Sequence, residues 1–318
     1  HPSGETARNP YKPNRKALHT MNRRRFLGTT GLATLGVLSG SLDLRAQTLT
    51  KAKKLTILHT NDTHSNIDPF PMSHAKYPGM GGVAKRAALI EKIRSEEEHV
   101  LLLDSGDIFQ GTPYFNKYHG VLEMKLMSAM QYDAATMGNH DFDIGLDGFK
   151  KAQQHANFPF LCSNYDFKST VLEGATLPHL IIKKGGLRIG LFGIGVNLEG
   201  LAGKANYGGM NYLDPVQIAN DTAKYLKEQH CDLIVCLSHL GFEYASNQIS
   251  DKVLASQSSN IHLILGGHTH TFLEKPLLTE NRDKQPVLIN QTGWAGLFLG
   301  RIDIDFQKSL FRHEMVVV

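Results

Sequence analysis

The stretch Leu55-Thr-Ile-Leu-His-Thr-Asn-Asp-Thr-His64 passes from an apolar run straight into a polar loop. Residues 55–59 have the pattern of a short strand that is buried on both faces. Asp62 and His64 come just beyond its end, which is where open α/β sheets bind their ligands. A lone Asp-x-His pair is explained equally well by two solvated loop residues, so the rest of the chain has to decide between the two interpretations.

Polar side chains follow four more apolar runs in the same way. These clusters are Asp104-Ser-Gly-Asp107, Gly138-Asn-His-Asp-Phe-Asp143, Ser238-His239 and Gly266-Gly-His-Thr-His270. Each alone has a simple structural explanation, such as a turn capped by asparagine or a core histidine bonded to a carbonyl. All five together are poorly explained in that way, and their carboxylate, amide and imidazole groups suit Mn, Zn, Fe or Co better than Mg or Ca. They are too many for one ion with an open position, whereas two ions that share a bridging carboxylate would use them all.

Runs with strand character alternate with helical patterns from about residue 53 onward. The predicted helices are residues 82–94, 116–130, 146–155, 214–229 and 242–256. The predicted strands are residues 55–59, 99–103, 133–137, 158–162, 179–183, 187–196, 233–237, 261–265, 287–290, 297–306 and 311–318. This alternation predicts a mostly parallel sheet, to which the later hairpins add antiparallel strands. We therefore expect an α/β fold of two mixed β-sheets packed together and flanked by helices, a four-layer αββα sandwich that forms one domain over residues 48–318.

The positive charge of the chain is concentrated in its first residues. Residues 1–47 carry eight Lys or Arg against two acidic residues, so the remainder holds −2 of the formal net charge of +4. A body with this charge has no general attraction for nucleic acid, and no nucleic-acid partner is expected.

Residues 21–47 have the features of an export signal. Met21-Asn-Arg-Arg-Arg-Phe-Leu places consecutive arginines before a run, residues 26–42, that is too short and too rich in glycine for a stable membrane span. Arg-Arg-x-Phe-Leu resembles the twin-arginine signal, so a periplasmic location is expected; a basic tail beside a short helix is the alternative. The first cysteine is Cys162, so a lipoprotein anchor at this signal is not expected. Residues 1–20 are interpreted as an upstream extension or tag.

The five clusters, in this order, resemble the motifs of the calcineurin-like metallophosphoesterases. More narrowly, Leu55–Ile67 and Tyr132–Asp143 resemble the two signatures of the 5′-nucleotidase family, and the likeness extends over residues 54–306. The resemblance implies that one divalent metal is held by Asp62, His64, Asp107 and His270, and the other by Asp107, Asn139, His239 and His268. It also implies that His140 and Asp143 are the catalytic pair, and that water activated by the two metals attacks phosphorus in line.

This resemblance implies a metal-dependent hydrolase that acts on a small phosphorylated substrate, with nucleotide phosphomonoesters as the first choice. A phosphodiesterase or a thiosulfohydrolase would use the same metal pair, and a non-catalytic metal-bearing subunit is the alternative from another class. Two positions depart from the common family pattern, Asp141 in place of Glu and His270 in place of Gln. Family members usually continue into a second domain that binds the nucleoside. We expect that domain to be missing from this chain, and a separate nucleoside-binding protein to serve as a partner in trans.

Overall fold

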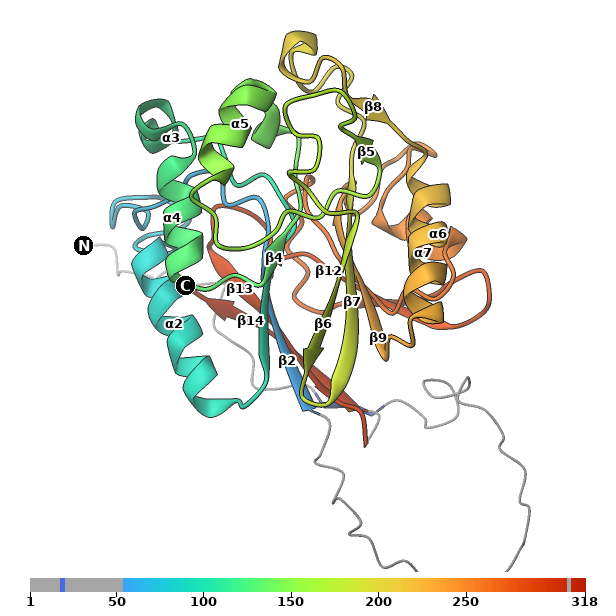
Figure 1. Ribbon diagram of the computed structural model, residues 1–318. Helices are drawn as coiled ribbons and strands as arrows, with labels where there is room; N and C mark the ends of the chain where they lie inside the picture. Colours follow the sequence, from blue (N-terminus) through green and yellow to red (C-terminus); the bar gives the residue numbers. More distant parts are fainter. Residues whose placement is uncertain (1–17, 21–53, 308–309) are drawn as a thin grey trace, which may run out of the picture.

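The computed structural model describes residues 18–20, 54–307 and 310–318, and two six-stranded β-sheets lie face to face at its centre (Figure 1). The strand order of the first sheet is β1 (Leu18–Thr20), β14 (Leu310–Val317), β13 (Phe298–Asp305), β2 (Lys54–Thr60), β3 (Val100–Asp104) and β4 (Ala134–Ala135). The order of the second is β11 (Leu277–Glu280), β12 (Pro286–Asn290), β10 (Leu263–Leu265), β9 (Leu233–His239), β7 (Leu187–Gly195) and β6 (His179–Lys184). A small separate sheet pairs β5 (Tyr165–Asp166) with β8 (Asn211–Tyr212).

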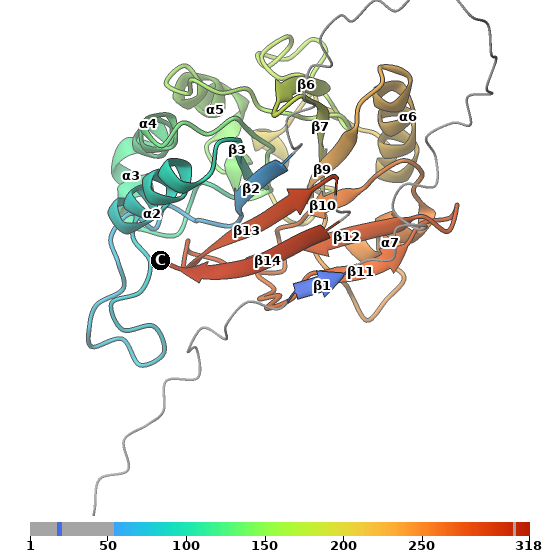
Figure 2. The ribbon, with the colours of Figure 1, turned by 90° about the horizontal axis from the view of Figure 1, so that it is seen from below.

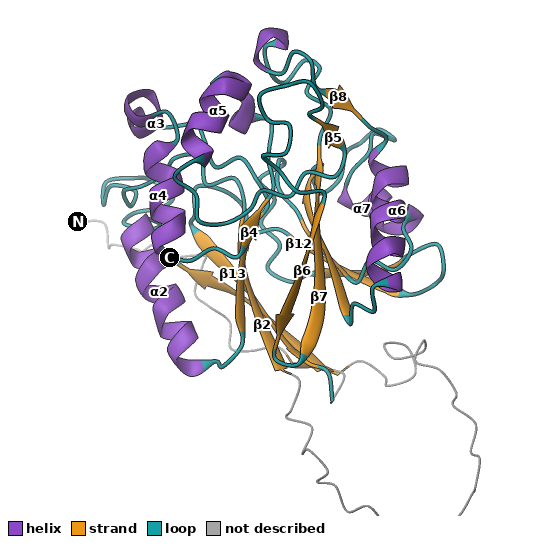
Figure 3. Cartoon of the chain, in the orientation of Figure 1, coloured by secondary structure: helices purple, strands orange, loops and turns teal. Residues whose placement is uncertain are grey.

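Both large sheets are mixed, and helices cover their outer faces (Figure 3). Strands β2, β3 and β4 are parallel, as are β7, β9, β10 and β12. Antiparallel pairs join β1, β14, β13 and β2 in the first sheet, and join β6 to β7 and β11 to β12 in the second. The helices beside the first sheet are α2 (Val83–Glu96), α3 (Pro113–Tyr118), α4 (Val121–Ala129) and α5 (Gly145–Gln153). Those beside the second are α6 (Pro215–Glu228) and α7 (Asp251–Gln257), and two 3₁₀ turns are η1 (His140–Phe142) and η2 (Lys204–Asn206). The predicted α/β sandwich of two mixed sheets between helices is confirmed.

Most of the buried apolar side chains in the described residues lie in three layers, one between the sheets and one under each group of helices, and a smaller cluster surrounds Tyr77 and Phe298. Ile57 and Leu103 belong to the layer between the sheets, whereas their neighbours Leu58 and Leu102 face the helices of the first sheet. Because successive side chains of a strand point to opposite faces, a strand is apolar throughout only where both faces are covered. Figure 2 shows the two groups of helices from below, with α2 to α5 on one side of the sheets and α6 and α7 on the other.

The sequence predicts one continuous helix over residues 116–130, and this prediction is wrong. The structure has two helices, α3 and α4, separated by His119 and Gly120, whose φ angles are 49° and 83°. A left-handed backbone ends a helix, and glycine adopts it at little cost. Met124 and Met127 on α4 are buried in the core.

Two further predicted elements differ from the structure. The helix expected from residue 242 begins only at Asp251, where the Ser250 side chain accepts a hydrogen bond from the Val253 backbone N–H and caps it. The strand expected over residues 158–162 is reduced to isolated bridges, among them Ala135 with Phe160. Strand β11 was not predicted.

The export-signal prediction for residues 21–47 lies outside the described residues. Leu18–Thr20, within the segment interpreted as an extension, pairs antiparallel with β14 as strand β1. Among the helices that the structure describes, none combines the length and the apolar character that a membrane crossing requires.

Candidate metal centre

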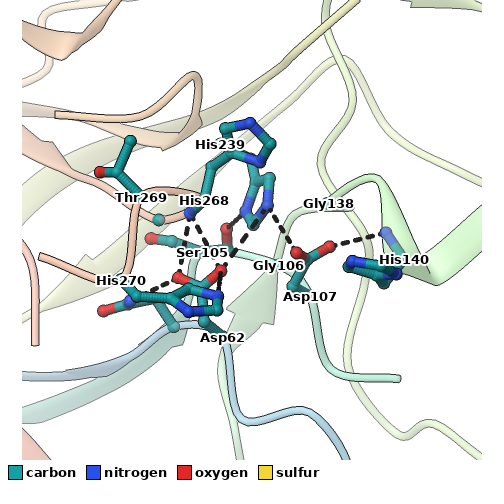
Figure 4. Close-up of polar contacts among 12 residues, drawn as sticks. Asp62, Ser105, Gly106, Asp107, Gly138, His140, His239, His268, Thr269 and His270 are labelled. Atoms are coloured by element: carbon teal, nitrogen blue, oxygen red, sulfur yellow. Dashed lines mark hydrogen bonds and ion pairs between the residues drawn. The ribbon is translucent and has the colours of Figure 1, made fainter. Parts of the chain in front are cut away.

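Two groups of metal-ligating side chains meet where the polar loops leave the carboxyl ends of the central strands (Figure 4). In each group the ligand atoms lie within 4.8 Å of one another. The first group consists of Asp62, His64 and His270, and the second consists of Asp107, His239 and His268.

Asp107 and Asp62 bring the two groups together. Asp107 Oδ2 lies 3.1 Å from His239 Nε2 of its own group and 3.8 Å from His64 Nε2 of the other. Asp62 Oδ1 lies 3.4 Å from His270 Nε2 and also accepts a hydrogen bond from the backbone N–H of His268 at 3.0 Å. Both carboxylates therefore lie within reach of histidines from the two groups, and the bridging role of Asp107 stays a prediction.

The backbone of this centre is strained at the ligands themselves. Left-handed φ angles, between 46° and 73°, occur at five of the seven predicted metal ligands: Asp62, His64, Asp107, His268 and His270. Residues other than glycine rarely adopt this conformation, and they do so mainly where surrounding structure holds a functional geometry. The loops therefore hold these five side chains so that they point toward the same small region.

Backbone carbonyls orient two of the imidazoles. His239 Nδ1 donates to the Ser105 carbonyl at 2.6 Å, and His64 Nδ1 donates to the Phe109 carbonyl at 3.2 Å. With Nδ1 engaged, the Nε2 atom of each ring is the one presented to the centre, as in metal sites whose histidine tautomer is fixed by an outer partner.

The donor set fits two divalent cations. Asn139 Oδ1 is buried and has no hydrogen-bond partner among the described residues, although buried amide oxygens are normally paired. A cation beside it would satisfy that oxygen. Imidazole, carboxylate and amide groups together suit ions such as Mn or Zn.

Electrostatics within the centre prepare some of the predicted ligands for a metal, whereas His239 would first have to lose a proton. Burial lowers the pKa of His268 to about 4 and also lowers the pKa of His64, so both rings are neutral near pH 7. Burial acts to raise the pKa of Asp107, but the neighbouring imidazoles of His239 and His64 outweigh it and hold that pKa below its ordinary value. Burial likewise acts to lower the pKa of His239. The Asp107 carboxylate outweighs burial and raises the pKa of His239 to about 10. A bound cation would displace that proton, since metal ligands bind in their deprotonated form.

The predicted catalytic pair lies at the edge of this centre. His140 Nδ1 is 2.8 Å from Asp143 Oδ2, and the His140 backbone N–H donates to Asp107 Oδ1 at 2.8 Å. The hydrogen bond to Asp143 raises the pKa of His140. The His140 side chain is 34% exposed, so it can reach a substrate.

Comparison with known proteins identifies the family. A family model described as calcineurin-like phosphoesterase matches residues 55–272. The chain belongs to this family. It is 32% identical over 298 residues to the snake venom 5′-nucleotidase of Crotalus adamanteus, with 87% of this chain and 47% of the venom protein covered. Identity to the 5′-nucleotidase of Homo sapiens is 31%, over 81% of this chain and 47% of the human protein.

Solved structures agree with this assignment. The 5′-nucleotidase precursor from Thermus thermophilus superposes with a TM-score of 0.75 at 29% identity, over 83% of this chain and 54% of that one. The chain therefore spans about half the length of these 5′-nucleotidases.

In this phosphoesterase domain Asp141 has a role that the sequence did not reveal. Its buried carboxylate accepts backbone N–H bonds from residues that surround the bridging ligand: Asp107, Ile108, Phe109 and Gly138. Burial and the Asp107 carboxylate raise the pKa of Asp141 to about 7. The sequence placed Asp141 inside the cluster Gly138–Asp143, at a position where the family usually has Glu, but did not indicate these contacts.

Two further residues of the phosphoesterase site were missed. The Trp294 ring stacks on His270, with centroids 5.8 Å apart and planes at 9°. The Asn206 side chain donates to the Asp143 backbone carbonyl at 3.1 Å. Both lie far from their partners in sequence, so spacing could not indicate them.

Proposed function

We propose that this domain is a binuclear metal-dependent phosphomonoesterase whose leading substrates are nucleotides. The observation that supports it most is the meeting of two ligand groups at Asp107, with the His140–Asp143 pair hydrogen-bonded to the same carboxylate. One cation would be held by Asp62, His64, Asp107 and His270, and the other by Asp107, Asn139, His239 and His268. When bound, two such cations polarise a phosphoryl oxygen and make hydroxide available at neutral pH.

The residues of the catalytic pair act on the leaving side of the ester. Asp143 orients the His140 ring and favours its protonated form, so that ring can stabilise phosphoryl charge or give a proton to the departing oxygen. The similarity to 5′-nucleotidases supports nucleotides over other esters, and gives no support to the phosphodiesterase and thiosulfohydrolase alternatives.

Metal analysis and turnover of p-nitrophenyl phosphate by the purified protein test this function. After loading with Mn, Zn or Co, we expect two metals per chain and hydrolysis that a chelator abolishes. Two bound metals without hydrolysis of any phosphoester in a panel would instead indicate a non-catalytic metal-bearing subunit.

We further propose that the protein is exported to the periplasm, and that a separate nucleoside-binding protein acts with it in trans. The twin-arginine-like motif at Arg23 and Arg24 supports the first proposal. Replacing both residues by lysine should block export without reducing activity in cell extracts. Unchanged periplasmic activity would show that a different export route is used.

A further inference from the structure

A cavity of about 720 Å³ adjoins the metal centre. Its walls come from three segments far apart in the sequence, within residues 196–201 after β7, residues 212–216 at the start of α6, and residues 247–257 around α7. His268 also lines it. Such a volume is typical of sites for small molecules.

The cavity is linked to the proposed chemistry at two points. His268 belongs to one of the two ligand groups, so the cavity meets the metal centre directly. The loop between β7 and β8, which supplies part of the wall, also carries Asn206, the residue that holds the Asp143 carbonyl. A second cavity of about 560 Å³, lined by residues within 66–71 and 112–118, includes none of the predicted ligands or catalytic residues.

The lining of the first cavity has a definite chemical character. Among the described residues around it are two acidic side chains, Glu199 and Asp214, and four side-chain amides, but no lysine or arginine. Tyr212 forms part of the wall, but its hydroxyl is shielded from solvent and does not face the cavity. The four side-chain amides can recognise hydroxyl-bearing groups, whereas two carboxylates repel an anion.

We propose that this cavity binds the leaving group of the ester and selects neutral or cationic leaving groups over anionic ones. This assignment rests on the proposed phosphomonoesterase function. A nucleoside monophosphate releases a neutral nucleoside into the cavity, whereas a nucleoside diphosphate that loses its terminal phosphate releases an anion. The domain therefore prefers monophosphates, although a diphosphate presents an equally good terminal phosphoryl group to the metals.

Glu199 is the cavity residue whose substitution best tests selection by charge. Its side chain is exposed, and no contact of that side chain holds the fold together in the described structure. Asp214 is unsuitable because it caps α6 by accepting from the Gln217 backbone N–H at 2.7 Å. Glu91→Lys is a matched control, since it makes the same change of charge at an exposed position of α2, which lies on the opposite side of the molecule from α6 and α7 (Figure 1, Figure 2).

The test measures kcat/KM of the metal-loaded protein for AMP and ADP, and for choline phosphate against its uncharged analogue 3,3-dimethylbutyl phosphate. The wild type should prefer AMP and choline phosphate. Glu199→Lys should lower the AMP-to-ADP preference at least about threefold, Glu199→Gln by less, and Glu91→Lys not at all. The effect should weaken at high salt, because exposed charges are screened.

A second variant tests occupancy of the cavity without changing charge. Gln248→Ala removes one of the exposed cavity amides, and should lower kcat/KM for AMP relative to that for methyl phosphate, whose leaving group is too small to fill the cavity. Cleavage of AMP and ADP with the same ratio in the wild type and Glu199→Lys would overturn the proposal, and leave the phosphomonoesterase function intact. If the protein with two metals bound cleaves no monoester, both the leaving-group proposal and the phosphomonoesterase function are overturned. Turnover of methyl phosphate distinguishes this result from failure of the leaving-group proposal alone.

Discussion

At the scale of single residues, the proposed two-metal centre would depend most on Asp107. Its two oxygens contact His239 and His140, and it lies between both ligand groups. Asp107→Asn removes the charge that would hold two cations close together, so we expect loss of activity and of most metal binding. Metal analysis measures this directly, and metal titration can be followed by the fluorescence of Trp294, the single tryptophan, which stacks on His270. Asp147→Asn, an exposed change on α5, is the control; two metals and normal turnover in Asp107→Asn would contradict the bridging role.

His140 and Asp143 should separate catalysis from metal binding. His140→Ala removes a proton donor or charge stabiliser, which corresponds to a loss of roughly 10²–10⁴-fold in kcat. Asp143→Asn weakens the hydrogen bond that raises the His140 pKa, so the limb of the pH profile that reports protonated His140 should move to lower pH. Both variants should keep two metals per chain. Loss of a metal from His140→Ala would show that His140 is a ligand and that the pair is wrongly assigned.

The predicted ligands could be found in the sequence because each lies in a short motif directly after a strand. Asp62 and His64 are two positions apart, as are His268 and His270, and such local spacing is visible without a structure. The contacts that orient them depend on chain folding. Trp294 touches His270 from a different loop, and such long-range neighbours leave no pattern in a single sequence.

At the scale of helices and strands, the sequence predicted the buried strands well and the helix boundaries less well. Strands β2 and β3 are continuous apolar runs because both of their faces are covered, which is a strong local signal. The break between α3 and α4 depends on the left-handed backbone at His119 and Gly120. An isolated glycine in a helical pattern is tolerated or ends the helix, and periodicity alone cannot decide between these outcomes.

Strand β2 also buries a histidine whose titration should influence stability. His59 is fully buried, its Nε2 accepts from the Asn290 side-chain amide at 2.8 Å, and burial together with His313 lowers its pKa to about 3. Between this pKa and the unfolded value near 6.5, the unfolded chain binds more protons at this residue. The free energy of unfolding therefore rises with pH across that window and falls on acidification, by up to about 1.4 kcal/mol per pH unit from one group.

Chemical denaturation at several pH values tests this contribution of His59. His59→Gln should give a shallower dependence of unfolding free energy on pH between about 6.5 and 4, even though the variant is less stable at pH 7. His155→Gln, at an exposed histidine, should keep the slope of the wild type. Equal slopes in His59→Gln and the wild type would show that His59 is not the group responsible.

At the scale of the whole molecule, the described domain holds the predicted ligands and catalytic pair but spans about half of its 5′-nucleotidase relatives. The Phe and Tyr side chains of the two long loops, residues 65–82 and 197–212, are largely used in packing and so are not free to stack a nucleoside base. Tyr77 is buried, Phe70 packs between Tyr77 and Trp294, and Tyr207 packs against the main core. Only Tyr212 of that set lines the cavity beside the metal centre.

This arrangement predicts that the 318-residue protein distinguishes leaving groups by charge and hardly by base. Stacking on one aromatic ring contributes about 1–3 kcal/mol and tolerates every base, because each base has a π face. The cavity amides belong to exposed, adaptable side chains, so none is fixed well enough to discriminate one base edge from another. We expect kcat/KM values for AMP, GMP, CMP and UMP that differ by less than about a hundredfold, equivalent to about 2.7 kcal/mol. Steady-state kinetics on the purified protein, without any added partner, measure these values. A larger preference for one nucleotide would mean that the loops already form a finished base pocket, and that a nucleoside-binding protein in trans is not needed.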